Sequence, residues 1–194
     1  MKDRYSYVLN AILYIVYLGN VKFDNFIGAI VYFPFYLFKF CLPKRISNIY
    51  IKRISKGNEE YSKLIKNPKN GSCMDCSGSI FGFLYANYTF IPLGLIIGLL
   101  VKQYGVLHPI IYMPLIIIMI AITWQPVRRK VFKDYRYLKY FKKFEKEDKQ
   151  WHRKWALITV AFCFCSLLSA AFGIYLCFAC AIGRFDLWNL MARG

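Results

Sequence analysis

The chain has 194 residues, of which 58% are hydrophobic and 19% aromatic, and its formal net charge is +17. A soluble domain keeps its apolar content near half, because apolar surface has to be buried. The combination of high apolar content and strong positive charge therefore argues against a soluble domain. The two properties are also separated along the chain, since residues 155–183 contain no Asp, Glu, Lys, Arg or His. This separation indicates an integral membrane protein.

Residues 1–42 form an aromatic-rich N-terminal membrane segment. Two apolar runs, Tyr5–Gly19 and Asn25–Leu42, are separated by a polar stretch. One helix over both runs would be about 57 Å long, which is too long for a single crossing. Two interpretations stay open: two short spans, or an interfacial or re-entrant segment followed by one span. The cations Lys2 and Arg4 favour two spans, whereas the short first run favours one.

Residues 43–79 form a basic loop, with eight Lys and Arg against three acidic residues. Residues 125–154 form a second basic loop, with twelve against four. Lys and Arg collect in the loops of a membrane protein that stay in the cytoplasm. A surface that binds nucleic acid is the other interpretation of such a charge. The attachment of both loops to long apolar runs argues against nucleic acid as a partner.

Residues 80–124 predict a transmembrane helical hairpin. The apolar runs Ile80–Val101 and Val106–Trp124 each reach about 20 residues, the length that a helical span needs, and only four residues join them. The hairpin returns the chain to its starting side, so both basic loops lie on one side of the bilayer. Residues 155–183 predict the last transmembrane helix. The short tail 184–194 then lies on the opposite side.

The second basic loop contains a helical pattern. Apolar side chains recur at helical spacing and lysines occupy the other faces, which predicts a basic amphipathic helix over Val131–Phe144 at the membrane interface. The apolar positions are Val131, Tyr135, Leu138 and Phe141. A second, shorter interfacial helix is predicted from Ile46, Ile49, Tyr50 and Ile54. Cations near an anionic surface bind its headgroups, so we expect lipid or partner binding by Arg128, Arg129, Lys130, Lys133, Arg136, Lys139, Lys142 and Lys143.

Small residues recur along the first long span. Such positions let two helix backbones approach closely in a membrane. The last span has Ser169 and Gly173 at the same spacing, whereas Val106–Trp124 has almost no small residues and is bulky throughout Leu115–Ile120. We therefore expect the first and last long spans to pack together and Val106–Trp124 to face lipid. Whether the small residues serve packing within one chain or self-association stays open; they are Gly78, Gly82, Ala86, Gly94 and Gly98.

Two cysteine pairs have C-x-x-C spacing, Cys73/Cys76 and Cys177/Cys180. Such pairs are typical of zinc and thiol-redox sites. The predicted topology separates them by the hydrocarbon thickness of about 30 Å, so they do not form one four-thiolate site, and no resident metal or cofactor is predicted. Cys73 and Cys76 precede a helix, and a helix N-terminus together with nearby Lys69 favours a thiolate. A thiol-redox or metal role for this pair is an alternative hypothesis.

The predicted fold is all-α: a polytopic integral membrane helical bundle of four to five spans, with basic amphipathic interfacial helices. The expected function is that of a non-enzymatic membrane accessory or interaction protein. It would bind a partner or anionic lipid through its basic cytoplasmic face, in a bacterial inner membrane or its equivalent. An oligomeric pore lined by Asn87, Ser166 or Ser169, with a use in defence, is the alternative function.

Overall fold

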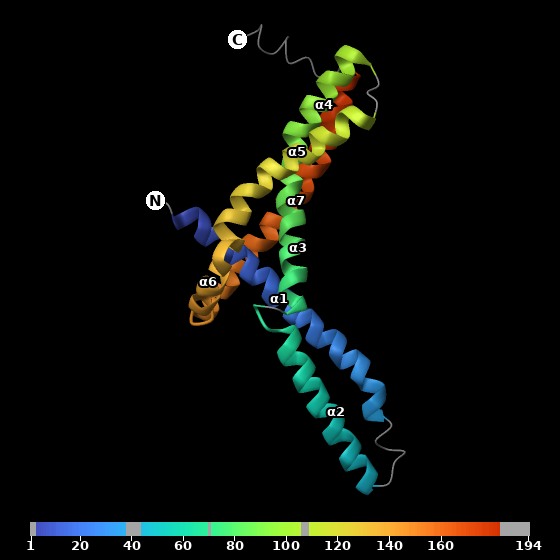
Figure 1. The fold of residues 1–194 in the computed structure, drawn as a ribbon, viewed down its shortest axis with the longest axis vertical. Coiled ribbons are helices and arrows are strands. Elements are labelled where there is room, and N and C mark those ends of the chain that lie inside the picture. Colours follow the sequence, from blue (N-terminus) through green and yellow to red (C-terminus); the bar gives the residue numbers. More distant parts are fainter. Residues whose placement is uncertain (1–2, 38–43, 70, 106–108, 183–194) are drawn as a thin grey trace.

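The computed structural model describes residues 3–37, 44–69, 71–105 and 109–182. The predicted tail 184–194 lies outside the described residues. Within them, all regular structure is helical (Figure 1), which confirms the all-α prediction. Four helical segments are long and apolar enough to cross a membrane: Arg4–Val31, Ser72–Tyr104, Ile110–Phe144 and Lys149–Ala181.

Helix α1 extends unbroken over Asp3–Leu37. The prediction that the polar stretch after Gly19 divides this segment is therefore wrong. The polar side chains in the stretch have partners on other elements: Asn20 Nδ2 donates to Ser77 Oγ at 2.7 Å, and Lys66 Nζ donates to Asn25 Oδ1. Because these partners satisfy the polar groups, the stretch has no need to leave the helix.

Helix α2 covers Lys44–Ile65 and is longer than the predicted interfacial helix. It is polar and amphipathic, and the second half of α1 lies beside it, so that the two helices project together at one end of the molecule (Figure 1). At the base of this arm, Tyr17 OH donates to the backbone oxygen of Lys66 at 2.5 Å. This bond joins the end of the α2 segment to the buried half of α1.

Helices α3 (Ser72–Ala86) and α4 (Phe90–Tyr104) form one rod, joined by the 3₁₀ turn η2 (Asn87–Thr89). The turn lies just before Pro92, which has no N–H to donate to the fourth carbonyl before it. The rod begins eight residues earlier than the predicted span. It ends at Gly105, whose φ of 77° suits glycine, and α5 (Pro109–Val127) then returns antiparallel, as predicted for the hairpin.

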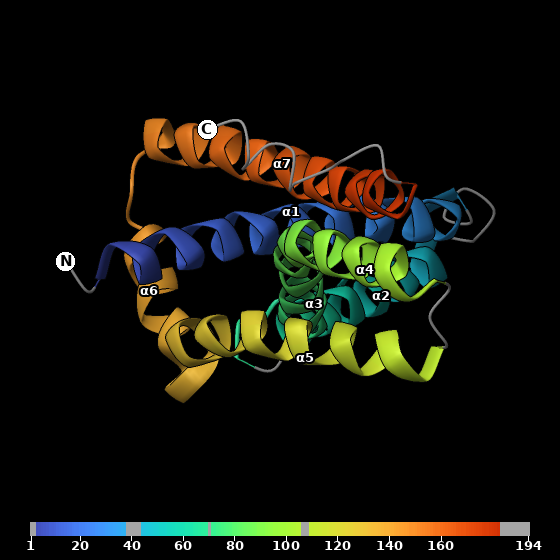
Figure 2. The same ribbon diagram turned by 90° about the horizontal axis from the view of Figure 1, so that it is seen from above.

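Helix α7 covers Lys149–Ala181. Its N-terminus is capped by Asp148, whose Oδ1 accepts from the Trp151 backbone N at 2.8 Å. Helix α7 packs along α4, while α5 and α7 lie on opposite sides of α3 (Figure 2). Most of α5 is exposed, with little of its apolar surface covered by protein. The contact of α4 with α7 agrees with the packing predicted for the first and last long spans, while the prediction that Val106–Trp124 faces lipid stays a prediction.

The predicted single helix Val131–Phe144 is broken. A π-helical turn, η3 (Arg128–Phe132), continues α5, and α6 covers only Arg136–Phe144. Between them, in the short turn η4 (Lys133–Tyr135), Asp134 and Tyr135 both have positive φ, at 56° and 51°. The break rotates the face of the segment, so that the predicted apolar position Tyr135 is 53% exposed.

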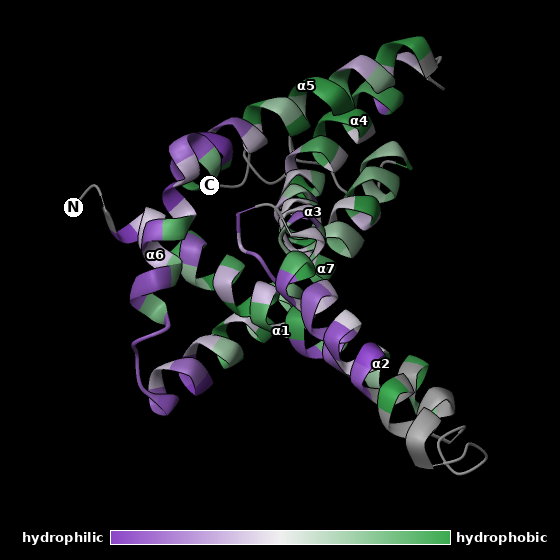
Figure 3. Cartoon of the chain, turned by 60° about the horizontal axis from the view of Figure 1, so that its bottom comes forward, coloured by the Kyte–Doolittle hydropathy of each residue, from purple (hydrophilic) through white to green (hydrophobic). Residues whose placement is uncertain are grey.

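The apolar face of α6 lies inside the protein. Its buried side chains Tyr137, Phe141 and Phe144 join a core formed with the first half of α1, the start of α3 and the start of α7. Tyr14 of α1 meets Phe141 edge to face, with ring centroids 4.9 Å apart. Hydrophilic residues gather on α6, the start of α7 and α2, whereas α4 and α5 are hydrophobic (Figure 3). The aromatic core therefore lies at the basic end of the long helices.

Candidate functional site

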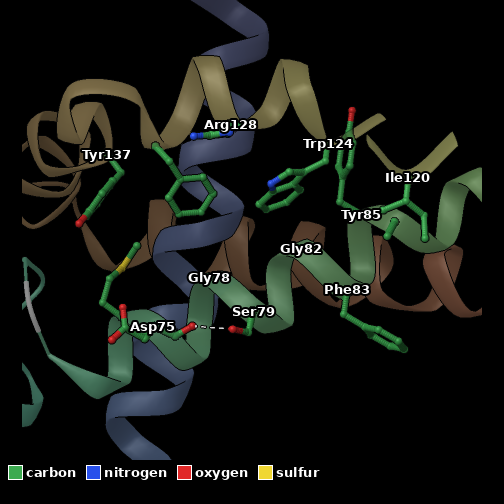
Figure 4. A pocket seen from close by; sticks show the side chains of 13 residues that line it. Asp75, Gly78, Ser79, Gly82, Phe83, Tyr85, Ile120, Trp124, Arg128 and Tyr137 are labelled. Carbon is green, nitrogen blue, oxygen red and sulfur yellow. Dashed lines mark hydrogen bonds between the residues drawn. The ribbon is translucent and has the colours of Figure 1, made fainter. Parts of the chain in front are cut away.

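A groove of about 720 Å³ separates α3 from the end of α5 and the η3 turn (Figure 4). Gly78, Gly82 and Ala86 form its α3 wall, and Trp124 faces them from α5. The glycines have no side chains to fill the space. A Cβ placed on Gly82 would lie 3.0 Å from the Trp124 ring, whereas one on Gly78 would lie 3.6 Å from Phe132.

The groove is apolar along most of its length and charged at one end. Trp124 packs on Phe132 with ring centroids 5.8 Å apart, and together they form the wall opposite α3. Asp75 on α3 and Arg128 at the start of η3 line the same groove (Figure 4). The arrangement can accept a molecule with an apolar chain and a charged end.

A second pocket of about 510 Å³ adjoins the charged end. Gln125, Arg128, Arg129, Phe132 and Lys133 line it. Arg128 and Phe132 line both pockets, so the two spaces meet at these side chains. Three cations thus surround a space next to the mouth of the apolar groove.

The structure divides the eight predicted basic residues into two groups. Lys130 Nζ lies 4.7 Å from the centroid of the Tyr5 ring, and Lys143 Nζ lies 5.6 Å from that of Tyr7. These cation–π contacts join the η3–α6 segment to α1. The other six predicted cations are exposed and have no such ring contact among the described residues, whereas Lys143 is exposed but lies over the Tyr7 ring; the six are Arg128, Arg129, Lys133, Arg136, Lys139 and Lys142.

The predicted small residues fall in two places. Gly94 and Gly173 lie at the α4/α7 contact, where a Cβ on Gly94 would come within 2.0 Å of the Gly173 carbonyl oxygen. Gly98 lies against Cys177 and Cys180 further along the same contact. Gly78, Gly82 and Ala86 instead line the open groove. Intramolecular packing accounts for the first group and leaves the second group without a partner helix in close contact.

The polar side chains of the predicted pore lining lie inside the protein. Asn87 Nδ2 donates to Ser166 Oγ at 3.0 Å, and Ser166 Oγ donates to the Leu84 carbonyl oxygen at 2.8 Å. Ser169 Oγ donates to the Cys165 carbonyl oxygen of its own helix at 2.7 Å. All three side chains are buried. The hydrogen bonds of Asn87 and Ser166 connect the α3–η2 segment to α7, whereas that of Ser169 stays within α7.

The cysteine pairs are far apart. Cys73 and Cys76 lie in the first turn of α3, whereas Cys177 and Cys180 pack beside Gly98 near the other end of the rod. A helix from 73 to 98 covers about 37 Å at 1.5 Å per residue. Cys73 is buried and Cys76 is exposed. Lys69, expected to favour a thiolate, has its Nζ 5.7 Å from the centroid of the Tyr135 ring. Among the described residues, no three His, Cys, Asp or Glu side chains cluster as metal ligands.

Sequence reasoning missed two residues of the groove, Asp75 and Trp124. Trp124 stands at the basic end of an apolar run, where tryptophan is enriched in membrane proteins. Asp75 lies between Cys73 and Cys76, and the C-x-x-C spacing gives no sign of a separate role for this carboxylate. The approach of α3 to the end of α5 depends on the η3 turn and the kink after it, which have no sequence signal.

The fold and the groove define an all-helical protein with four helices suited to crossing a membrane and a charged-ended groove between two of them. No family model matches this chain, and no curated protein or solved structure matches it.

Proposed function

We propose that the protein is a non-enzymatic integral membrane accessory protein that holds phospholipid, anionic lipid included, by its phosphate group on a basic cytoplasmic face. The four long apolar segments are its spans, and the two basic loops lie together in the cytoplasm of a bacterial cell or its equivalent. The observation that carries the proposal is the pocket bounded by Arg128, Arg129 and Lys133, which shares the side chains of Arg128 and Phe132 with an apolar groove.

The position of the cations supports a lipid over a soluble anion. They lie at the end of α5, where its apolar surface stops and the polar η3 turn begins. A helix that crosses the bilayer has its ends at the headgroup level, so these side chains lie at the depth of lipid phosphates. Arg also binds phosphate oxygens with two parallel hydrogen bonds.

The packing of α6 favours a fixed site over a helix that floats on the membrane. Its apolar face is buried among the rings of α1 and α7, so this face is not free to insert into lipid. The six exposed cations outside the cation–π contacts therefore have a defined place relative to the groove. Three line the pocket at its mouth, and three lie on α6: Arg136, Lys139 and Lys142.

The test is native mass spectrometry of the full chain in detergent micelles with added phosphatidylglycerol. The triple variant Arg128→Gln, Arg129→Gln, Lys133→Gln should bind this lipid about tenfold more weakly or worse, because each cation near an anionic surface contributes about 1 kcal/mol.

The matched control carries the same charge change on α6: Arg136→Gln, Lys139→Gln, Lys142→Gln. It should lose much less affinity, since none of these side chains lines the pocket. Equal losses in the two triple variants, or no loss in either, would contradict the proposed site.

A further inference from the structure

We propose that the groove between α3 and α5 is a site for a zwitterionic aminophospholipid, phosphatidylethanolamine, with its phosphate on Arg128, its ammonium on Asp75 and one acyl chain along the glycines of α3. This inference rests on the proposed function, since it requires the phosphate site at the mouth of the groove. It adds the second charge of the headgroup and the position of the chain.

Two opposite charges face the groove from different walls. Asp75 lies in the first turn of α3 and Arg128 begins η3 (Figure 4). Both side chains are exposed. Among the described residues, neither the Asp75 carboxylate nor the Arg128 guanidinium takes part in an ion pair, although both side chains line one groove. A ligand that carries both an anion and a cation supplies a counter-charge for each group.

The neighbours of Asp75 leave its carboxylate open to a donor. Ser79 Oγ donates to the Asp75 backbone oxygen at 3.0 Å, so this hydrogen bond leaves the carboxylate unused. A primary ammonium carries three N–H donors and forms charge-assisted hydrogen bonds to a carboxylate. Phosphatidylethanolamine has such an ammonium two carbons from its phosphate ester.

Below the charged mouth the groove has the chemistry of an acyl-chain site. Gly78, Gly82 and Ala86 contribute small surfaces to its α3 wall between the larger side chains of Met74, Phe83 and Tyr85, and Ile120 and Trp124 form the opposite side. Lipid-facing helices normally cover themselves with large apolar side chains, as α5 does with its exposed isoleucines. A strip of small residues beneath a pair of opposite charges instead leaves room for a chain to lie between two helices.

Other common headgroups match the two charges less well. Phosphatidylglycerol has no cation for Asp75. Phosphatidylserine has an ammonium, but on the same carbon it carries a carboxylate that Asp75 repels. Phosphatidylcholine has a cation without N–H donors, so it forms no hydrogen bond to the carboxylate. Phosphatidylethanolamine offers Asp75 an ammonium with N–H donors and no second anion beside it.

The experiment is native mass spectrometry of the full chain in detergent, with phosphatidylethanolamine, phosphatidylglycerol and phosphatidylcholine that have the same chains and are added in equal amounts. An interfacial ion pair of this kind corresponds to about a fivefold preference. We therefore expect the first bound lipid to be phosphatidylethanolamine about fivefold more often than either competitor. Soluble glycerophosphoethanolamine, which has no acyl chains, should not displace it at the same concentration.

The variant Asp75→Asn should remove the preference while it leaves binding of phosphatidylglycerol unchanged or improved. Its matched control is Glu60→Gln, which removes an exposed carboxylate of α2 outside the groove and should keep the preference. The side chain of Asp75 is exposed, so circular dichroism should show the same helix content in the variant.

The outcomes separate this inference from the proposed function. If phosphatidylethanolamine shows no preference, or if Asp75→Asn retains it, the inference is wrong, whereas loss of all phospholipid binding in the Arg128, Arg129, Lys133 variant still supports the phosphate site. If that triple variant binds every lipid like the parent chain, the proposed function fails first, and the inference fails with it.

Discussion

The contact between α4 and α7 and the groove between α3 and α5 use the same kind of residue for opposite results. Along the single rod of α3 and α4, glycines recur at helical spacing. At Gly94 the backbone of α7 is so close that a Cβ would come within 2.0 Å of a carbonyl oxygen. At Gly78 a Cβ would meet only the Phe132 ring, at 3.6 Å. One stretch of small residues closes a contact and the other lines an open space.

The facing helix decides which result occurs. Helix α7 presents Gly173 to Gly94, so neither backbone carries a side chain at the contact and the two approach each other. Opposite Gly82 stands Trp124, whose large ring prevents such an approach. A small-residue spacing therefore shows that two helices could touch, but only the partner shows whether they do.

The largest expected effect is that of Gly94→Ala, which tests the closed contact. The new Cβ would collide with backbone atoms of α7, which cannot move aside like the end of a side chain. We expect a loss of about 2 kcal/mol or more in the free energy of unfolding, at the upper range of overpacking effects. Unfolding in mixed micelles with sodium dodecyl sulfate, followed by circular dichroism, measures it.

The matched control for this prediction is Gly78→Ala on the same rod. Its Cβ would make an ordinary contact with Phe132, and alanine is the better helix former by about 0.5–1 kcal/mol. The control should therefore unfold at the same or a higher detergent fraction. If the two variants lose the same stability, the backbone contact at Gly94 is not what holds α4 against α7.

Sequence reasoning predicted much of the long-helix arrangement. Apolar run length predicted the hairpin of α4 and α5, and residue size predicted that α4, and not α5, packs against the last helix. These predictions succeeded because span length and backbone approach depend on properties that each residue carries by itself. The same reasoning placed a break after Gly19, where tertiary hydrogen bonds from Asn20 and Asn25 instead keep α1 helical.

The groove could not be predicted, because it depends on backbone geometry without a sequence signal. Asp134 and Tyr135 both have positive φ, a conformation unusual for residues other than glycine. Their kink moves α6 against α1 and leaves η3 over α3. The predicted helix face was consequently wrong at Tyr135, and the sequence could not show that Asp75 and Arg128 carry opposite charges at one end of the same groove.

An intermediate effect is expected from Asn87→Leu, which tests the polar contact beside the closed end. The amide donates to Ser166 Oγ at 3.0 Å between two buried side chains. Hydrogen bonds between helices in membranes contribute about 0.6 kcal/mol on average, and leucine, which has the same length as asparagine but is bulkier, also has to fit the site. We expect a loss of about 1 kcal/mol in the same unfolding assay.

The control for the polar contact is Thr159→Val. The Thr159 hydroxyl is buried on α7 and has no hydrogen-bond partner among the described residues. Valine has nearly the same shape, so replacing an unsatisfied hydroxyl should leave stability unchanged or raise it. A loss at Thr159 as large as that at Asn87 would show that the assay responds to any change at the α7 surface.

The smallest expected effect on stability is that of Gly82→Ala, and it tests the open groove most directly. The new Cβ would lie 3.0 Å from the outer edge of the Trp124 ring, and this half-buried ring borders empty space into which it can shift. We expect stability within about 0.5 kcal/mol of the parent chain, because the shift and the better helix propensity of alanine oppose each other. Trp124 fluorescence, measured with the other tryptophans replaced by phenylalanine, should change because the ring moves. A loss of stability as large as that of Gly94→Ala would mean that α3 and α5 are packed as tightly as α4 and α7, and that the space between them holds no ligand.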